Sequence, residues 1–209
     1  MRSTATLAIA AARIRSLRPV VFVLVLISAG AGIGVQALRE PVPLLLTSLL
    51  FMSAVAIAIA YANRPPLQGP LAGVEESAPL FGRERARANA IVPGAVVLLC
   101  ASAQYVGTRA LGHGTVPAIL FLLSAIGGIT ALTIALSVPL RSRWNRALYA
   151  ALAIGGALLS GGLAAFVLFA TRSQAAATAA ALAVALPVGF VALRQYGEAL
   201  ARYDPLPGA

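Results

Sequence analysis

The residues that could carry chemistry are few, and their types exclude several classes of protein. The chain contains no lysine, one histidine, His113, and one cysteine, Cys100. A retinal Schiff base therefore has no amine, and a haem has no pair of histidine ligands. No group of Cys, His and carboxylate side chains has metal-site spacing, and no Walker-type phosphate-binding sequence occurs. We expect no catalytic residue, no cofactor, no metal and no ATP hydrolysis by this chain itself.

The acidic residues lie outside the apolar segments or at their edges: Glu40, Glu75, Glu76, Glu84, Glu198 and Asp204. A proton- or sodium-driven carrier usually binds its ion at ionisable groups inside the membrane, so we do not expect this chain to be such a carrier by itself. Gln104 and Tyr105 are the larger polar groups within an apolar segment. They are candidates for lining a substrate pathway, and the alternative is hydrogen bonding between helices.

The elements that must position these residues are membrane-spanning helices. Of the 209 residues, 60% are hydrophobic and only 11% are charged, whereas a soluble domain has about 25% charged residues. A transmembrane helix needs about 20 apolar residues. Six windows meet that rule: 19–37, 42–62, 91–111, 116–140, 147–170 and 175–193. We expect an all-α, polytopic integral membrane protein in which residues 1–209 form a single transmembrane domain.

The distribution of arginine predicts the orientation of these spans. All 16 basic residues are arginine, and the formal net charge is +10. Thirteen lie in the N-terminal segment, the loops after the second and fourth windows, and the C-terminal tail; three lie on the opposite side. Because arginine-rich segments stay in the cytoplasm, both termini are predicted to be cytoplasmic. Topology explains the charge better than nucleic-acid binding does. The Ala- and Arg-rich composition resembles that of a high-GC bacterium, so we expect a multi-pass protein of a bacterial plasma (inner) membrane.

The N-terminal segment admits two interpretations. Its arginines, the apolar run and the small residues at 35–37 fit a signal peptide. The run from Val20 is long enough to span, however, and we expect an uncleaved first span. The residues before Pro19 are predicted to form a short interfacial helix, because apolar residues recur there at helical spacing.

Small residues at a spacing of four indicate close helix packing. Gly30 and Gly34 form one such pair in the first span, and Gly156 and Ser160 form another in the fifth. Small side chains allow two helix backbones to approach, so that van der Waals contact stabilises their association. We expect packing within the chain, with a subunit interface as the alternative.

The longest loop, residues 63–90, is predicted to be cytoplasmic. A Pro- and Gly-rich linker is followed, from Glu75 to Arg87, by a short amphipathic helix that leads into the third span. Together with the basic N-terminus and the basic link at 137–143 that ends the fourth span, this layout resembles the permease subunits of type-2 ABC exporters. In that family the N-terminal interfacial helix and the helix between spans two and three form the seat of a separate ATPase.

The resemblance implies an ATP-driven transporter whose energy comes from a separate ATP-binding subunit. It also implies a homodimer, or a heterodimer with another membrane subunit. The ATPase-coupling residues would be Leu80, Phe81, Arg83 and Arg85. The family usually has re-entrant helices between spans five and six, whereas only a few residues separate those spans here, as expected of a reduced or accessory relative.

Two other functions fit the same residues. One is a non-catalytic structural or accessory subunit of a larger membrane complex, which would also lack buried charges and be rich in small residues. The other is the substrate-binding component of an energy-coupling vitamin importer, which would need a polar pocket near the outer surface. All three place the chain in the lipid bilayer and none involves nucleic acid.

Overall fold

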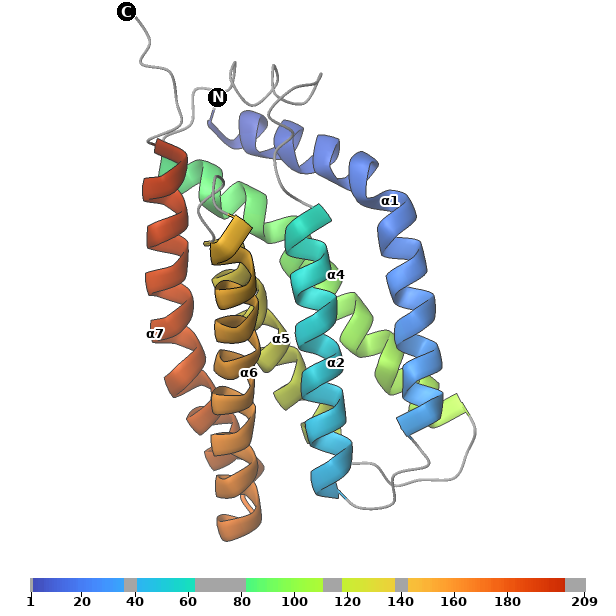
Figure 1. The fold of residues 1–209 in the computed structure, drawn as a ribbon. Coiled ribbons are helices and arrows are strands. Elements are labelled where there is room, and N and C mark those ends of the chain that lie inside the picture. Colours follow the sequence, from blue (N-terminus) through green and yellow to red (C-terminus); the bar gives the residue numbers. More distant parts are fainter. Residues whose placement is uncertain (1, 36–40, 63–81, 111–117, 138–142, 202–209) are drawn as a thin grey trace, which may run out of the picture.

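The computed structural model describes residues 2–35, 41–62, 82–110, 118–137 and 143–201. Within them the chain forms six helices, namely α1 (Arg2–Val35), α2 (Pro41–Ala62), α4 (Gly82–Ala110), α5 (Ala118–Leu136), α6 (Arg143–Thr171) and α7 (Gln174–Ala201). Consecutive helices run in opposite directions, so the beginning of α1 and the end of α7 lie at the same end of the bundle (Figure 1). We call this the terminal end.

Five of the described helices are long and apolar enough to cross a membrane, in agreement with an all-α membrane protein. Their apolar parts are Pro43–Tyr61, Ala90–Arg109, Ala118–Leu136, Ala147–Thr171 and Gln174–Glu198. The sixth helix, α1, carries a shorter apolar stretch, Arg18–Gly34, which is close to the minimum of about 17 residues for a span. The rest of the predicted first span, residues 36 and 37, lies outside the described residues.

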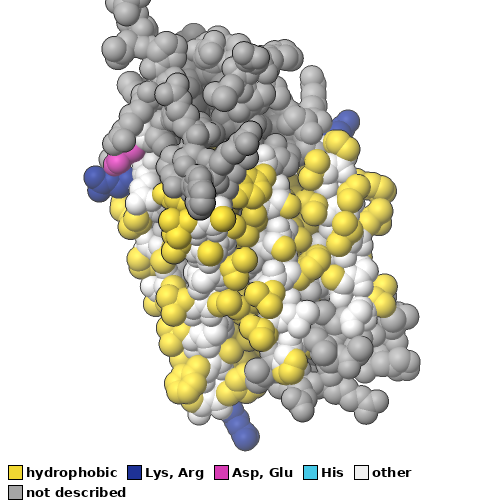
Figure 2. All heavy atoms as spheres, in the orientation of Figure 1, with side chains coloured by type: hydrophobic (Ala, Val, Ile, Leu, Met, Phe, Trp, Pro, Cys, Tyr) yellow, Lys and Arg dark blue, Asp and Glu magenta, His cyan; other side chains and the backbone are white. Residues whose placement is uncertain are grey.

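The lateral surface of the bundle is apolar. Large side chains such as Phe22, Phe166 and Phe190 are mostly exposed, at 66%, 72% and 70%. Figure 2 shows hydrophobic side chains across the middle of one face, with the charged side chains of the described residues near its two ends. Water would disfavour so large an apolar area, whereas lipid tails do not.

At the terminal end, the helical segments before the first and third spans are continuous with those spans. The residues before Pro19 are helical, as predicted, but they form one helix with the first span, because α1 continues through this proline from Arg2 to Val35. The helix bends near its middle (Figure 1), as expected where a proline removes a backbone hydrogen bond. Helix α4 runs from Gly82 without a break into the third span, as predicted, and residues 75–81 of the predicted amphipathic helix lie outside the described residues.

Within the fourth predicted span, 116–140, the structure describes residues 118–137, and the helix ends near the carboxyl end of this part. Helix α5 ends at Leu136, and the Ser137 amide donates to the carbonyl oxygens of Thr133 and Ile134 at 3.3 and 3.1 Å. Such shared bonding is typical of a tightened last turn. Pro139 follows, and a proline disfavours helical geometry at the residue before it. A window chosen by apolar length alone extends past Pro139.

Helix α5 forms the centre of the bundle. It packs against α2, α4, α6 and α7, and 78% of its apolar part is buried, compared with 17% for α7. Helix α1, by contrast, lies at the side and contacts mainly α4. The bundle therefore has two parts: a group of helices around α5, and a peripheral helix held on by α4.

The link between α6 and α7 consists of two residues, Arg172 and Ser173. Arg172 has a φ of 54°, and its amide donates to the Leu168 carbonyl at 2.8 Å, which ends α6 with a left-handed residue. The Ser173 hydroxyl then accepts a hydrogen bond from the Ala176 amide at 3.3 Å and caps α7. The link has no room for a re-entrant helix.

Candidate functional site

Helix α4 carries the polar residues of the candidate site to the interior. Its buried positions include Val96, Cys100, Gln104 and Thr108. These residues recur every four positions and therefore share one face of the helix. Gln104 is fully buried at 0% exposure, because α4 packs against α1, α2, α5 and α7.

The backbones of α1 and α4 approach each other closely at two glycines. A Cβ atom added at Gly32 would meet the carbonyl oxygen of Gln104. On the other helix, a Cβ atom added at Gly107 would meet the carbonyl oxygen of Ala29. Only glycine fits at such positions, since a main-chain carbonyl cannot move aside without moving its helix. We call this contact, formed by Ala29, Gly32, Gln104 and Gly107, the α1–α4 seam.

The side chain of Gln104 leaves the seam in the direction of α2. Its Nε2 atom donates a hydrogen bond to the Ser48 hydroxyl at 3.3 Å, and both residues are fully buried. The Oε1 atom has no hydrogen-bond partner among the described residues. A buried amide oxygen without a partner is costly, and it is free to accept a hydrogen bond from a polar ligand or a water molecule.

Most other buried hydroxyls are occupied within their own helix. Ser28 donates to the Leu24 carbonyl at 2.7 Å, Ser53 to Leu49 at 2.6 Å and Ser160 to Ala157 at 3.1 Å. The Cys100 thiol is also buried. The three hydroxyls bond to their own backbone, which leaves Gln104 as the described buried side chain with an unused polar atom.

Tyr105 is adjacent to Gln104 in sequence, but its side chain contacts a different set of residues. Its ring packs on Phe121 with the centroids 5.1 Å apart. Its hydroxyl accepts a hydrogen bond from Arg109 Nε at 3.2 Å, and the Arg109 guanidinium lies 5.4 Å from the ring centre. Arg109 is exposed at the end of the apolar part of α4. Tyr105 therefore belongs to a cluster near this end and not to the seam.

The two small-residue pairs lie in different environments. Gly156 packs within the chain, since an added Cβ atom would lie 2.6 Å from Cδ1 of Ile134 on α5, and Ser160 is fully buried. At Gly30 and Gly34, an added Cβ atom would meet nothing within 4 Å. These two glycines are exposed and point away from the seam.

The predicted ATPase-coupling residues are described only in part. Arg83 and Arg85 belong to the first turn of α4, whereas Leu80 and Phe81 lie outside the described residues, as does His113. The amphipathic helix predicted from Glu75 begins, as far as the structure describes it, at Gly82, where it is already part of the long helix α4.

Sequence reasoning missed the residues that form the seam. Gly32 lies between Gly30 and Gly34, and the spacing of four drew attention to the outer pair. Positions 30 and 34 share one face of a helix, and position 32 lies on the other. Nothing in the local sequence indicates which face meets α4. Gly107 stands alone in the third span, and its signal would have been a single glycine three residues after a buried glutamine.

The buried polar side chains of the described residues are uncharged. They are Ser28, Ser48, Ser53, Gln104, Thr108, Ser124, Thr130, Thr133, Ser137 and Ser160. No group of three or more His, Cys, Asp or Glu residues that could hold a metal occurs in the described part of the chain.

Comparison with known proteins adds no assignment. No family model matches the chain, and no curated protein and no solved structure has significant similarity to it.

Proposed function

We propose that the chain is the membrane-spanning permease subunit of an ATP-driven transporter, energised by a separate ATPase that docks at the terminal end. The α1–α4 seam is the observation that carries this proposal. Helices α1 and α4 both begin at the terminal end and continue as unbroken helices to the seam. A displacement of their ends would reach Gln104 along two continuous helices in direct backbone contact, each of which contains one proline before the seam.

The absence of charge from the described interior supports an external source of energy. A carrier driven by protons or sodium ions needs an ionisable group that binds the ion within the membrane, and the buried polar groups of the described spans are uncharged. A permease that is driven by ATP hydrolysis in another subunit has no such need. In this proposal Gln104, with its unused Oε1 atom, contacts the substrate when the seam opens.

Purification with a mild detergent, followed by mass spectrometry, tests the proposal. We expect an ABC-type ATPase at about one copy per chain. The variant Arg83→Glu/Arg85→Glu should lose the ATPase, because it reverses two charges in the first turn of α4. The matched control, Arg109→Glu/Arg172→Glu, reverses two charges at the opposite end and should retain it. Recovery of the chain without an ATPase would overturn the proposal.

The orientation is part of the same proposal, with the terminal end and both termini in the cytoplasm of a bacterium. Arg172 and Arg194 are exposed and lie near opposite ends of α7 and its link. An impermeant thiol reagent should label Arg172→Cys and not Arg194→Cys in intact cells, with the buried Cys100 silent. If only Arg194→Cys is labelled, the terminal end faces the outside of the cell and the proposed orientation is wrong.

A structural or accessory subunit of a larger membrane complex is the second candidate, and Gly30 and Gly34 favour it. Both are exposed and have open space beside them, so another transmembrane helix could approach α1 closely there. If Gly30→Leu/Gly34→Leu releases the chain from a membrane assembly that contains no ATPase, this candidate is the better one. A permease dimer joined at this face would instead keep its ATPase and lose only its second copy.

A further inference from the structure

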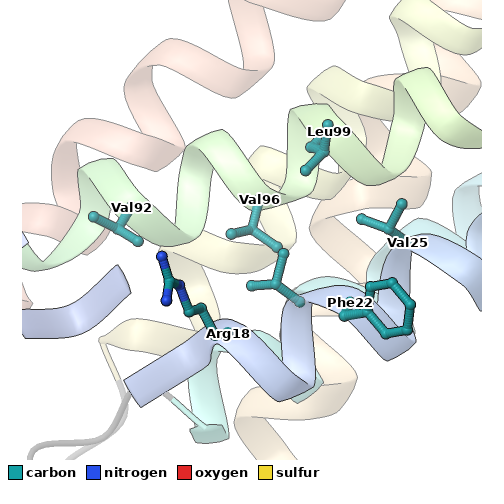
Figure 3. Close-up of a pocket in the computed structure, with 7 residues that line it drawn as sticks. Arg18, Phe22, Val25, Val92, Val96 and Leu99 are labelled. Carbon is teal, nitrogen blue, oxygen red and sulfur yellow. The ribbon is translucent and has the colours of Figure 1, made fainter. Parts of the chain in front are cut away.

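A groove of about 340 Å³ lies between α1 and α4, on the terminal-end side of the seam. Its lining comes from Arg18, Val21, Phe22 and Val25 on α1 and from Val92, Val96 and Leu99 on α4. Figure 3 shows the apolar side chains of both helices along the groove and the Arg18 side chain reaching from α1 towards Val92 on α4. All of the lining is apolar except this guanidinium.

The burial of the lining residues shows how the groove opens. Val92 and Val96 are only 7% exposed and form the floor, whereas Phe22 and Leu99 are well exposed and form the rim. The rim belongs to the apolar lateral surface of the bundle, which faces the lipid. An occupant that enters from this side must therefore be apolar along most of its length.

Arg18 lies at the boundary of the apolar part of the bundle, where the lipid headgroups are expected. It begins the apolar stretch Arg18–Gly34 of α1, and the neighbouring Val92 is close to the start of the apolar part of α4 at Ala90. Its side chain is exposed, and no hydrogen bond or ion pair joins it to another described residue. A guanidinium at this depth favours a phosphate, which it can bind through two parallel hydrogen bonds.

We propose that this groove binds a phospholipid of the surrounding bilayer, with one acyl chain between Phe22 and Leu99 and the phosphate on Arg18. The volume is at the lower end of the range for small-ligand pockets, about 300–1,000 Å³, which suits a segment of one chain. A peptide would leave its backbone amides unpaired against the valine floor. A water-soluble ligand has many polar groups, and the groove offers only the Arg18 guanidinium to pair with them.

Retention of defined lipids by the purified full-length chain tests the proposal. The chain is exchanged into detergent with phosphatidylglycerol, phosphatidylcholine or diacylglycerol, and bound lipid is counted by native mass spectrometry. We expect one retained phospholipid of either headgroup, and about tenfold weaker retention of diacylglycerol, which has no phosphate for Arg18 to bind. If diacylglycerol is retained as strongly as the phospholipids, Arg18 does not bind a phosphate and this part of the proposal is wrong.

Two matched pairs of variants locate the site. Arg18→Gln should weaken retention about tenfold, and Arg109→Gln, at the other end of α4, should not. Leu99→Trp should block the groove, whereas Leu98→Trp, equally exposed at 49% but not part of the lining, should leave retention unchanged. Melting temperatures verify that each variant is folded.

Two further results would overturn the proposal. One is equal retention by both members of either pair. The other is a wild-type chain that holds no lipid but forms a dimer which Leu99→Trp breaks, because the groove would then be covered by a second copy. Neither result depends on whether the chain associates with an ATPase.

Discussion

The α1–α4 seam and the packing of α2 against α5 and α6 both depend on glycine, but different groups meet the glycines. In the seam, Gly32 and Gly107 each face a main-chain carbonyl. In the other region, Gly127 and Gly161 form a notch for the Leu49 side chain, whose Cδ2 atom would lie 2.6 and 2.5 Å from Cβ atoms added there. A leucine can change its rotamer, whereas a carbonyl moves only with its helix.

The seam therefore defines the relative position of two helices, whereas the notch around Leu49 only fills the space between helices. The seam fixes the register and the distance of α1 relative to α4, because any larger residue separates the helices. The notch around Leu49 is ordinary close packing of a core, which partly relaxes when a side chain changes. It is therefore the seam that can transmit a displacement to Gln104, and substitutions in the two regions should behave differently.

The largest effect is expected in the seam. Gly32→Ala and Gly107→Ala should each destabilise the folded chain by more than about 3 kcal/mol, above the usual cost of overpacking. Gly30→Ala and Gly34→Ala are the controls; they should be neutral or stabilise by up to about 1 kcal/mol, since they gain helix propensity in open space. Thermal unfolding in detergent measures all four. If Gly32→Ala changes the free energy of unfolding as little as Gly30→Ala does, the backbones of α1 and α4 are not in contact at Gly32.

The next effect is expected at the notch. Leu49 is 2% exposed, so Leu49→Ala should cost about 3 kcal/mol through the cavity that it leaves. Leu50→Ala, at an exposed position next to it, should cost less than about 1 kcal/mol. Unfolding by a denaturing detergent measures both. Equal losses would mean that Leu49 faces lipid and not the glycines of α5 and α6.

A double-mutant cycle sharpens the contrast between the regions. Gly161→Ala alone should cost about 1–2 kcal/mol by overpacking. Combined with Leu49→Ala it should cost at least about 1 kcal/mol less than the sum of the single changes, because the added methyl group enters the cavity. In the seam no such rescue is possible: Gln104→Ala should not relieve Gly32→Ala, since the carbonyl remains. Rescue in the seam would show that a side chain, not the backbone, is in the way.

The smallest effect on stability is expected for Gln104→Leu. The change removes the bond to Ser48, worth about 1 kcal/mol, but it also removes the buried Oε1 that has no described partner. The free energy of unfolding should therefore change by less than about 1 kcal/mol. Ser48→Ala should cost more, because it leaves both ends of the Gln104 amide without a described partner. If Gln104→Leu is the more costly change, Oε1 has a bound water or another donor.

The positions of the helices could largely be predicted from the chain, because apolar length is a local property. The second to sixth predicted windows coincide with helices whose apolar parts could cross a membrane. The effect of a proline is harder to predict, because Pro19, Pro93 and Pro187 all lie inside continuous helices. A proline removes one hydrogen bond in each case, and contacts beyond the local sequence decide whether the helix continues.

The sequence by itself determined that this chain is a bundle of apolar helices with uncharged polar groups in its spans, since composition and apolar length need no knowledge of neighbours. Only the tertiary structure decided what each small or polar residue does. It turned Gly32 and not Gly30 towards α4, separated Gln104 from Tyr105, and opened a groove beside Arg18. The physical reason is that a helix presents every residue type on some face, and the packing of a second helix selects one face. That selection depends on residues up to 56 positions apart, as in the bond between Gln104 and Ser48.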